Sequence, residues 1–234
     1  MLFPDRKRPL LLGHRGVRQG VRENTLQAFE RALDLGLDGV ELDVQRSADG
    51  ALVVYHDFWV PGGLVHAMPY RELKAAVPGL CTLEEVLELF DRYPEAVLNV
   101  ELKSVPGFDD GRALATAKLL DAWPGKDRVL VSSFDPVALL AFRDRAPGIP
   151  IGFLFLGYDA SRIAPALGFE AVHPRLDLAT REKVAAWKEA GLFVTLWPIE
   201  TEEEARFALD SGADAVIGGF PRVLLKAKQE LGYA

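Results

Sequence analysis

Short apolar runs alternate with longer amphipathic stretches along the whole chain. This alternation is typical of repeated strand–helix units on a parallel sheet. The predicted strands are residues 9–13, 39–44, 96–102, 129–133, 151–156, 171–173, 193–197 and 215–217. Helical patterns lie near residues 24–33, 83–91, 110–121, 136–145, 161–167, 179–190, 202–210 and 221–229. Eight strands alternating with eight helices predict an α/β fold, a single closed (βα)8 TIM barrel over residues 1–234.

Two local features refine this picture. Asn24 is expected to cap the first helix, with Gln27 at the third helical position, because asparagine accepts hydrogen bonds from free N–H groups at a helix start. After the second strand, residues 51–55 form an extra extended piece, followed by a stretch with glycine and proline at residues 58–80. We expect residues 58–80 to form a short lid over the barrel.

Composition and charge narrow the function classes. A chain of 234 residues fits one barrel, and its net charge is −7. The one dense basic cluster, Asp5 to Arg8, is too short to follow a phosphate backbone, which argues against nucleic acid. The longest apolar run, residues 149–158, is shorter than the roughly 20 residues of a membrane helix. We therefore expect no stable membrane association. We also expect a cytoplasmic location, because the N-terminus does not show the pattern of a secretory signal.

Polar residues gather where the predicted strands end. Glu41 and Asp43 lie on the second strand, and Glu101 and Lys103 on the third. Because side chains alternate along a strand, each pair shares one face, while the residues between them face the other side. The active sites of such barrels lie at the carboxyl ends of the strands. Three carboxylates and a lysine are therefore expected at the barrel mouth.

Such a carboxylate cluster needs compensating positive charge. Two carboxylates about 5 Å apart repel by roughly 3 kcal/mol at an effective dielectric constant of 20. Lys103 offsets part of this repulsion, and an all-oxygen ligand set suits Mg²⁺ or Ca²⁺ better than zinc. The alternative is a salt-bridge network around Lys103, which is a costly way to stabilise a barrel.

Two histidines lie beside these strand ends. His14 and Arg15 follow the first strand, and His56 follows the extra extended piece. Histidine is the side chain best suited to proton transfer near neutral pH, so His14 and His56 are candidate acid and base. Trp197, at the end of the seventh strand, is a candidate to stack on a substrate, although packing at the rim explains it equally well.

At this point the sequence resembles the glycerophosphodiester phosphodiesterases. The segments that carry the resemblance span nearly the whole chain in order: GHRG (13–16), ENT (23–25), AF (28–29), GVELDVQRSADGALVVYHD (39–57), TLEEVLELF (82–90), LNVELK (98–103), SSF (132–134) and GADAVIGGFP (212–221). Any one fragment is a weak signal, but their combination is specific.

The resemblance implies a (βα)8 barrel that hydrolyses glycerophosphodiesters, such as glycerophosphocholine and glycerophosphoethanolamine, to glycerol 3-phosphate and an alcohol. It implies that Glu41, Asp43 and Glu101 bind the divalent metal ion, and that His14 and His56 act as acid and base. The residues that it places on the substrate or its phosphate are Arg15, Lys103 and Glu23. The sequence leaves open which histidine is the acid, and whether water or the glycerol 2-hydroxyl attacks.

Three departures from the family pattern stand out. Residues 58–80 are a short lid for the family. The chain reads Pro198-Ile199-Glu200 after Trp197, where the family more often continues into Thr and Asn. It reads Gly218-Gly219 before Phe220, where the family usually has Thr-Asp.

These departures bear on two rival hypotheses. The Gly218-Gly219 pair resembles the phosphate-binding corner of barrel isomerases and synthases, where glycines let backbone N–H groups reach a phosphate. That hypothesis leaves the three carboxylates unexplained. A lysophospholipase D-like activity is the nearer alternative and would need an apolar surface at the mouth, for which the candidates are Phe58, Trp59, Val60 and Leu64. The short lid favours small soluble substrates.

Overall fold

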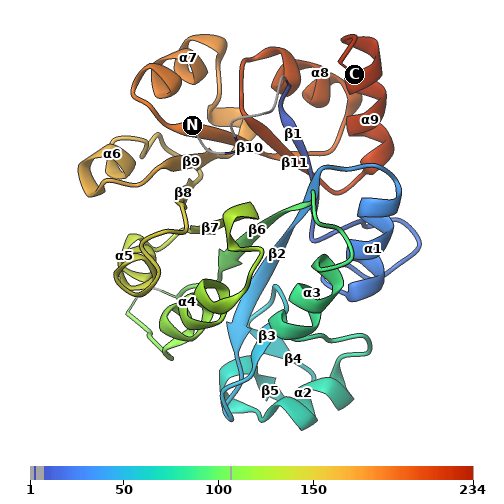
Figure 1. The fold of residues 1–234 in the computed structure, drawn as a ribbon, viewed down its shortest axis with the longest axis vertical. Coiled ribbons are helices and arrows are strands. Elements are labelled where there is room, and N and C mark those ends of the chain that lie inside the picture. Colours follow the sequence, from blue (N-terminus) through green and yellow to red (C-terminus); the bar gives the residue numbers. More distant parts are fainter. Residues whose placement is uncertain (1–2, 4–7, 106, 234) are drawn as a thin grey trace.

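A computed structural model describes residues 3, 8–105 and 107–233 (Figure 1). Eight parallel strands form the barrel: β1 (Leu10–His14), β2 (Gly39–Arg46), β6 (Val97–Leu102), β7 (Val129–Ser133), β8 (Ile151–Phe155), β9 (Ala171–Pro174), β10 (Phe193–Ile199) and β11 (Ala215–Gly218). Neighbours along this series pair with one another, and β1 pairs with both β11 and β2, which closes the ring. The predicted (βα)8 barrel is confirmed.

Helices follow the barrel strands and cover the outside of the barrel. They are α1 (Leu26–Asp34), α3 (Leu83–Phe90), α4 (Arg112–Ala122), α5 (Pro136–Arg145), α6 (Ile163–Leu167), α7 (Arg181–Glu189), α8 (Glu202–Asp210) and α9 (Pro221–Glu230). Two single-turn helices, η2 (Lys126–Arg128) and η3 (Leu176–Leu178), lie in connections. The sequence patterns placed every one of the eight main helices within about three residues, the usual uncertainty of helix ends.

The start of α1 differs from the prediction. Thr25, not Asn24, is the N-cap, and its hydroxyl accepts a hydrogen bond from the backbone N–H of Ala28 at 3.2 Å. Asn24 has a left-handed backbone, with φ 55°, and its buried side chain reaches Asp43 instead. The prediction of an Asn24 cap was wrong because either residue type suits a cap, and the tertiary contact to Asp43 decides between them.

Alternation along the strands divides the core into two layers. One face of the strands packs under the helices, through residues such as Val40, Leu42 and Val100. The other face fills the lower part of the barrel interior, through residues such as Leu12 and Phe193. The polar residues of this inner face lie towards the carboxyl ends of the strands. Because apolar side chains fill the interior below them, the internal polar site formed by the described residues lies at that end of the barrel.

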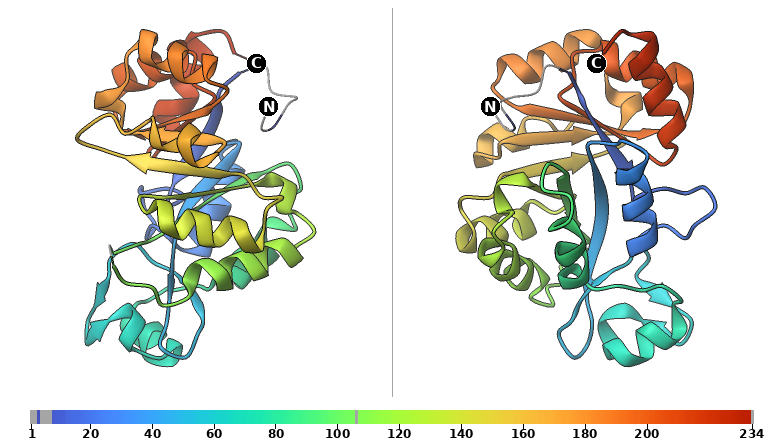
Figure 2. Two further views of the ribbon diagram at one scale, coloured as in Figure 1. Left: turned by 90° about the vertical axis from the view of Figure 1, so that its left-hand side faces the viewer. Right: turned by 45° about the vertical axis from the view of Figure 1, so that its right-hand side comes forward.

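The irregular connection after β2 forms a small substructure. Its elements are β3 (Leu52–Val54), β4 (Trp59–Val60), β5 (Gly63–Leu64), η1 (Val65–Ala67) and α2 (Tyr70–Ala76). Its apolar side chains, including Val60, Leu73 and Leu80, form a separate cluster. Figures 1 and 2 show it at the end of the molecule opposite to α7, α8 and α9. Its role as a lid stays a prediction.

The remaining expectations about surfaces concern the basic cluster and membranes. Asp5, Arg6 and Lys7 lie outside the described residues, whereas Arg8 forms an ion pair with Asp38 at 2.6 Å. Within the described part of the chain, no helix has the length and apolarity needed to cross a bilayer.

Candidate active site

A cavity of about 240 Å³ opens at the carboxyl ends of the barrel strands. One side is polar, with residues from β1, β2, β6 and the segment after β3, and the other side is mostly apolar, with residues from β7 to β11. The lining residues are His14, Arg15, Glu41, His56, Asn99, Glu101, Lys103, Ser132, Phe134, Leu154, Leu156, His173, Trp197 and Ile217. The cavity therefore suits a small molecule with one charged end and one less polar end.

Three carboxylates meet on the polar side. One oxygen each from Glu41, Asp43 and Glu101 lie within 4.8 Å of one another. Register explains this closeness, because Asp43 of β2 is paired directly with Glu101 of β6, and Glu41 is two residues from Asp43 on the same face. All three are largely withdrawn from solvent, and Glu41 Oε1 is buried without a hydrogen-bond partner among the described residues.

Burial and mutual repulsion shift the pKa values of these carboxyl groups. Burial, followed by the charges of Asp43 and Glu101, raises the pKa of Glu41 well above its ordinary value. Burial and then the charge of Asp43 raise the pKa of Glu101 to about 7, although Lys103 opposes this. Burial also acts to raise the pKa of Asp43, but Lys103 and Arg15 outweigh it and leave that pKa lowered. Lys103 and Arg15 therefore do not fully compensate the negative charge of the three carboxylates.

Two cations contact the cluster. Lys103 Nζ lies 3.0 Å from Glu101 Oε1 and 3.5 Å from Asp43 Oδ1. Arg15 Nε lies 3.2 Å from Asp43 Oδ2, and the Arg15 backbone N–H donates to Glu41 Oε2 at 3.0 Å. Arg15 has a left-handed backbone with φ 54°, which is uncommon for a side chain of its size. Such strain is retained where surrounding contacts demand it, and it often marks a functional site.

Asn24 supports this arrangement from the loop between β1 and α1. Its side-chain Nδ2 donates to Asp43 Oδ2 at 2.8 Å, and its backbone N–H donates to Arg15 O at 3.0 Å. The second interaction closes the loop that holds Arg15 in its strained conformation. Asn24 thus positions both a carboxylate and a guanidinium.

The hairpin of β2 and β3 brings His56 to the carboxylates. β2 continues past the barrel mouth to Arg46, and β3 returns antiparallel to it, with Val54 opposite Val44. Gln45 is buried and its Nε2 donates to the backbone oxygens of Tyr55 and Asp57, at 2.8 and 2.7 Å, which clamps the segment that carries His56. His56 Nδ1 lies 2.7 Å from Asp57 Oδ1.

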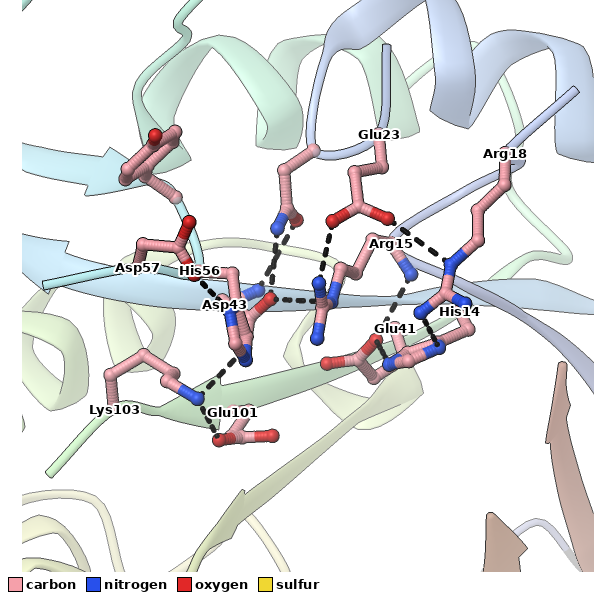
Figure 3. Close-up of polar contacts among 12 residues, drawn as sticks. His14, Arg15, Arg18, Glu23, Glu41, Asp43, His56, Asp57, Glu101 and Lys103 are labelled. Carbon is pink, nitrogen blue, oxygen red and sulfur yellow. Dashed lines mark hydrogen bonds and ion pairs between the residues drawn. The ribbon is translucent and has the colours of Figure 1, made fainter. Parts of the chain in front are cut away.

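His14 approaches the carboxylates from the other side (Figure 3). Its Nε2 lies 3.9 Å from Glu41 Oε2, and its Nδ1 lies 3.1 Å from Arg18 Nη2. Burial, followed by the charges of Arg15 and Arg18, lowers the pKa of His14 to about 3. His14 is therefore neutral at physiological pH in this arrangement.

Comparison with known proteins agrees with this geometry. Residues 14–223 match the glycerophosphoryl diester phosphodiesterase family. The chain belongs to this family. A glycerophosphodiester phosphodiesterase from Caldanaerobacter subterraneus subsp. tengcongensis is 32% identical over 248 residues, which cover 95% of this chain and 99% of the relative. One from Bacillus altitudinis is also 32% identical, over 94% of this chain and 98% of the relative.

Solved structures show the same fold. A phosphodiesterase from Oleispira antarctica, solved in complex with the product sn-glycerol-3-phosphate, superposes with a TM-score of 0.87 at 28% identity, over 95% of this chain and 97% of that one. A glycerophosphodiester phosphodiesterase from Thermotoga maritima gives 0.75 at 26% identity, over 96% and 99% of the two chains. This chain is accordingly a glycerophosphodiester phosphodiesterase, a phosphoric diester hydrolase.

The structure of this phosphodiesterase brings the predicted site residues together. Seven of them line the cavity, while Asp43 lies beneath it, in contact with Arg15 and Lys103. Glu23 accepts from Arg15 Nη1 at 2.5 Å and from Arg18 Nε at 3.1 Å, so it contacts guanidinium groups at the mouth. Trp197 donates to His173 O at 2.8 Å and lies edge-on to Phe134.

Sequence reasoning missed several residues of this site. Gln45 shares the strand face of Glu41 and Asp43, so alternation could have identified it. His173 was not among the predicted site residues, yet it lines the cavity fully buried, with neither ring nitrogen hydrogen-bonded to a described residue. Burial lowers its pKa to about 3. No local sequence pattern marks Arg18, which joins His14 through tertiary structure alone.

Proposed function

We propose that this phosphodiesterase hydrolyses small glycerophosphodiesters, such as glycerophosphocholine and glycerophosphoethanolamine, to glycerol 3-phosphate and an alcohol. The reaction depends on a divalent metal ion, Mg²⁺ or Ca²⁺, and on His14 and His56 as acid and base. The observation that carries the proposal is the buried carboxylate triad beside two imidazole rings in one cavity.

The triad fits a hard divalent cation. Glu41, Asp43 and Glu101 offer only oxygen ligands, which Mg²⁺ and Ca²⁺ prefer. Within the described part of the chain, Glu41 Oε1 is buried with no hydrogen-bond partner, which is a costly state for a carboxylate that a bound cation would relieve. When bound, the ion supplies Lewis acidity and charge neutralisation to the phosphodiester.

Arg15 and Lys103 supply the phosphate-binding charge. The three carboxylates exceed these two cations by one negative charge, so a divalent ion leaves the site with one positive charge, which matches the single negative charge of a phosphodiester. Both cations line the cavity and are anchored by carboxylates, which fixes where they can contact phosphoryl oxygens. Fixed cations of this kind stabilise charge that develops in the transition state.

The two histidines divide the proton transfers. The attacking hydroxyl loses its proton to one ring as its oxygen bonds to phosphorus. The bond from phosphorus to the leaving alcohol breaks, its electron pair stays on the alcohol oxygen, and that oxygen takes a proton from the other ring. Their positions on either side of the carboxylates support this division, because entering and leaving groups lie on opposite sides of phosphorus in an in-line displacement.

Lysophospholipid hydrolysis is a second candidate, favoured by one observation. Phe134 borders both the cavity and a neighbouring groove of about 500 Å³ that Phe108 and Val137 also line. The exposed rings and methyl groups of this groove could hold an acyl chain. No residue between 58 and 80 lines the cavity, so the apolar surface is not the one that the sequence indicated.

Removal of the metal ion tests the proposed function most directly. Exhaustive treatment with EDTA should abolish turnover of glycerophosphocholine, and added Mg²⁺ or Ca²⁺ should restore it. Choline release gives the rate, and thermal unfolding shows that the treated protein remains folded. Undiminished turnover by the metal-free protein would exclude the metal assignment, and no turnover with any added cation would exclude this substrate class.

A further inference from the structure

Arg18 is held by three loops at the cavity mouth. Its backbone N–H donates to Gly219 O at 3.1 Å. Its Nε donates to Glu23 Oε2 and its Nη1 to Glu200 Oε1, each at 3.1 Å. The third nitrogen, Nη2, lies 3.1 Å from His14 Nδ1 (Figure 3). Because all three guanidinium nitrogens are engaged, the orientation of the group is fixed.

Two departures of this chain from the family pattern meet at Arg18. Glu200 provides one of its carboxylate partners. Gly219 leaves room for the Arg18 side chain, because a Cβ atom at position 219 would lie 2.8 Å from Arg18 Cδ and 3.1 Å from Arg18 Nε. The same contact argues against a phosphate-binding corner at Gly218-Gly219, because a protein side chain occupies the space beside the second glycine. Arg18, Glu200 and Gly219 thus form one structural unit.

The contact with Arg18 determines where His14 carries its hydrogen. A guanidinium group has only donors, so His14 Nδ1 must accept. A neutral imidazole has one donor and one acceptor nitrogen, so the hydrogen lies on Nε2, the nitrogen nearest Glu41. The opposite holds for His56, because the Asp57 carboxylate accepts from Nδ1 and leaves a lone pair on Nε2.

We propose that Arg18 is a positioning residue that fixes His14 in the tautomer with hydrogen on Nε2. His14 is then the donor to the leaving alcohol, and His56 is the base. The inference rests on the proposed function, since it assigns the two roles that the acid–base mechanism leaves open. It adds to that mechanism a residue that contacts neither the metal ligands nor the phosphate-binding cations.

The proton and electron movements balance under this assignment. His56 Nε2 takes the proton of the attacking hydroxyl as its oxygen bonds to phosphorus. The leaving alcohol oxygen keeps the bonding electron pair and takes the hydrogen from His14 Nε2, and the charge left on that ring lies beside the Arg18 guanidinium. Where the glycerol 2-hydroxyl attacks, water then opens the cyclic phosphate, returning a proton to His14, while the 2-oxygen regains its proton from His56. Where water attacks directly, one proton passes from His56 back to His14 through solvent. A neutral imidazole has this donor role in other enzymes.

Nitrogen NMR of the imidazole rings tests the tautomer without measuring activity. The protein has four histidines, so ¹⁵N-labelled histidine gives four ring systems, and the His14→Gln variant identifies the signals of His14. In the Mg²⁺-loaded protein we expect hydrogen on Nε2 of His14. In Arg18→Met, which keeps the aliphatic chain and removes the donors, we expect a mixture of the two tautomers.

Steady-state kinetics with the same variants test the consequence. Arg18→Met should lower kcat for glycerophosphocholine roughly tenfold or more, a part of the about 10²–10⁴-fold that general acid–base catalysis contributes. KM should change much less, because the donor acts mainly in the transition state. Arg206→Met is the matched control, since Arg206 pairs with Glu230 on the outer surface. It should change neither parameter.

Each result separates the inference from the proposed function. Hydrogen on Nδ1 of wild-type His14, or an Arg18→Met protein with unchanged tautomer and kcat, would overturn the role of Arg18. Circular dichroism of Arg18→Met checks that a loss of rate is not a loss of fold. A wild-type protein without phosphodiesterase activity would contradict the proposed function, whereas the NMR result would still report on the Arg18 contact.

Discussion

Glu101→Gln should make the stability of the metal-free protein less sensitive to pH. Burial and Asp43 raise the pKa of Glu101 from its ordinary value of 4.5 to about 7. A carboxyl group with a raised pKa in the folded state contributes full stability below its unfolded pKa and loses it as pH rises through the folded pKa. Between these two pKa values, each rise of one pH unit lowers the free energy of unfolding by about 1.4 kcal/mol. The total loss is about 3 kcal/mol.

The assay compares free energies of unfolding by urea at pH 5, 6, 7 and 8 in EDTA. His14 and His173, whose pKa values are lowered to about 3, change stability in the opposite direction over this range. Their contribution is present in both proteins and cancels in the difference. Glu41 does not cancel, because the charge of Glu101 helps to raise its pKa; losing that charge adds to the gain in the same direction. Relative to wild type, Glu101→Gln should therefore gain about 3 kcal/mol between low and high pH, with most of the gain by pH 7.

Mg²⁺ should remove this difference in slope, because a metal ion binds the deprotonated carboxylate and stabilises the folded wild type. The control is Glu88→Gln, which changes an exposed glutamate on α3 far from the cavity. A difference between Glu101→Gln and wild type that stays constant from pH 5 to pH 8 would refute the reasoning, since it would mean that Glu101 does not titrate in this range.

Three further outcomes are expected. The kcat/KM for glycerophosphocholine should exceed that for lysophosphatidylcholine, because the cavity measures only about 240 Å³; a preference for the lipid would favour the second candidate function. His56→Ala should hydrolyse both glycerophosphocholine and a nitrophenyl phosphodiester slowly. His14→Ala should regain its rate on the nitrophenyl phosphodiester, because that leaving group needs no proton. An equal gain in rate for both variants would contradict the assigned roles. Asn24→Ala should cost about 1–3 kcal/mol in urea unfolding, because it removes a buried hydrogen bond to Asp43; an unchanged midpoint would show that this contact contributes nothing.

Local patterns predicted the barrel and the grouping of its carboxylates at one end. Glu41, Asp43, Glu101 and Lys103 could be placed together because strand alternation and the common mouth of a parallel barrel are regular rules. The same alternation pointed to Gln45, which was overlooked because it binds backbone and not a ligand.

Other features of the site depend on contacts that no local rule encodes. Asn24 and Thr25 are both good caps, and only the buried partner Asp43 shows which residue serves the helix. Arg18 reaches His14 only because Gly219, two hundred residues away in the chain, leaves room for it. The small substructure after β2 was recognised as an irregular connection, but its own apolar cluster follows from packing between short segments and not from periodicity.

The division of the cavity into two sides has a consequence for how such an enzyme can diversify. All the charged groups that line it come from residues 14–103, while the facing wall is mostly apolar and comes from Ser132, Phe134, Leu154, Leu156, His173, Trp197 and Ile217. Apart from Glu200 and Gly219 beside Arg18, and Ser132 and Ser133, which hydrogen-bond to Asn99 and to the Leu102 backbone, changes in the later half of the chain would alter the size and shape of that wall and leave the reacting groups in place. A change in specificity towards another leaving alcohol would therefore arise through substitutions in that half. The groups that carry out the reaction would stay the same.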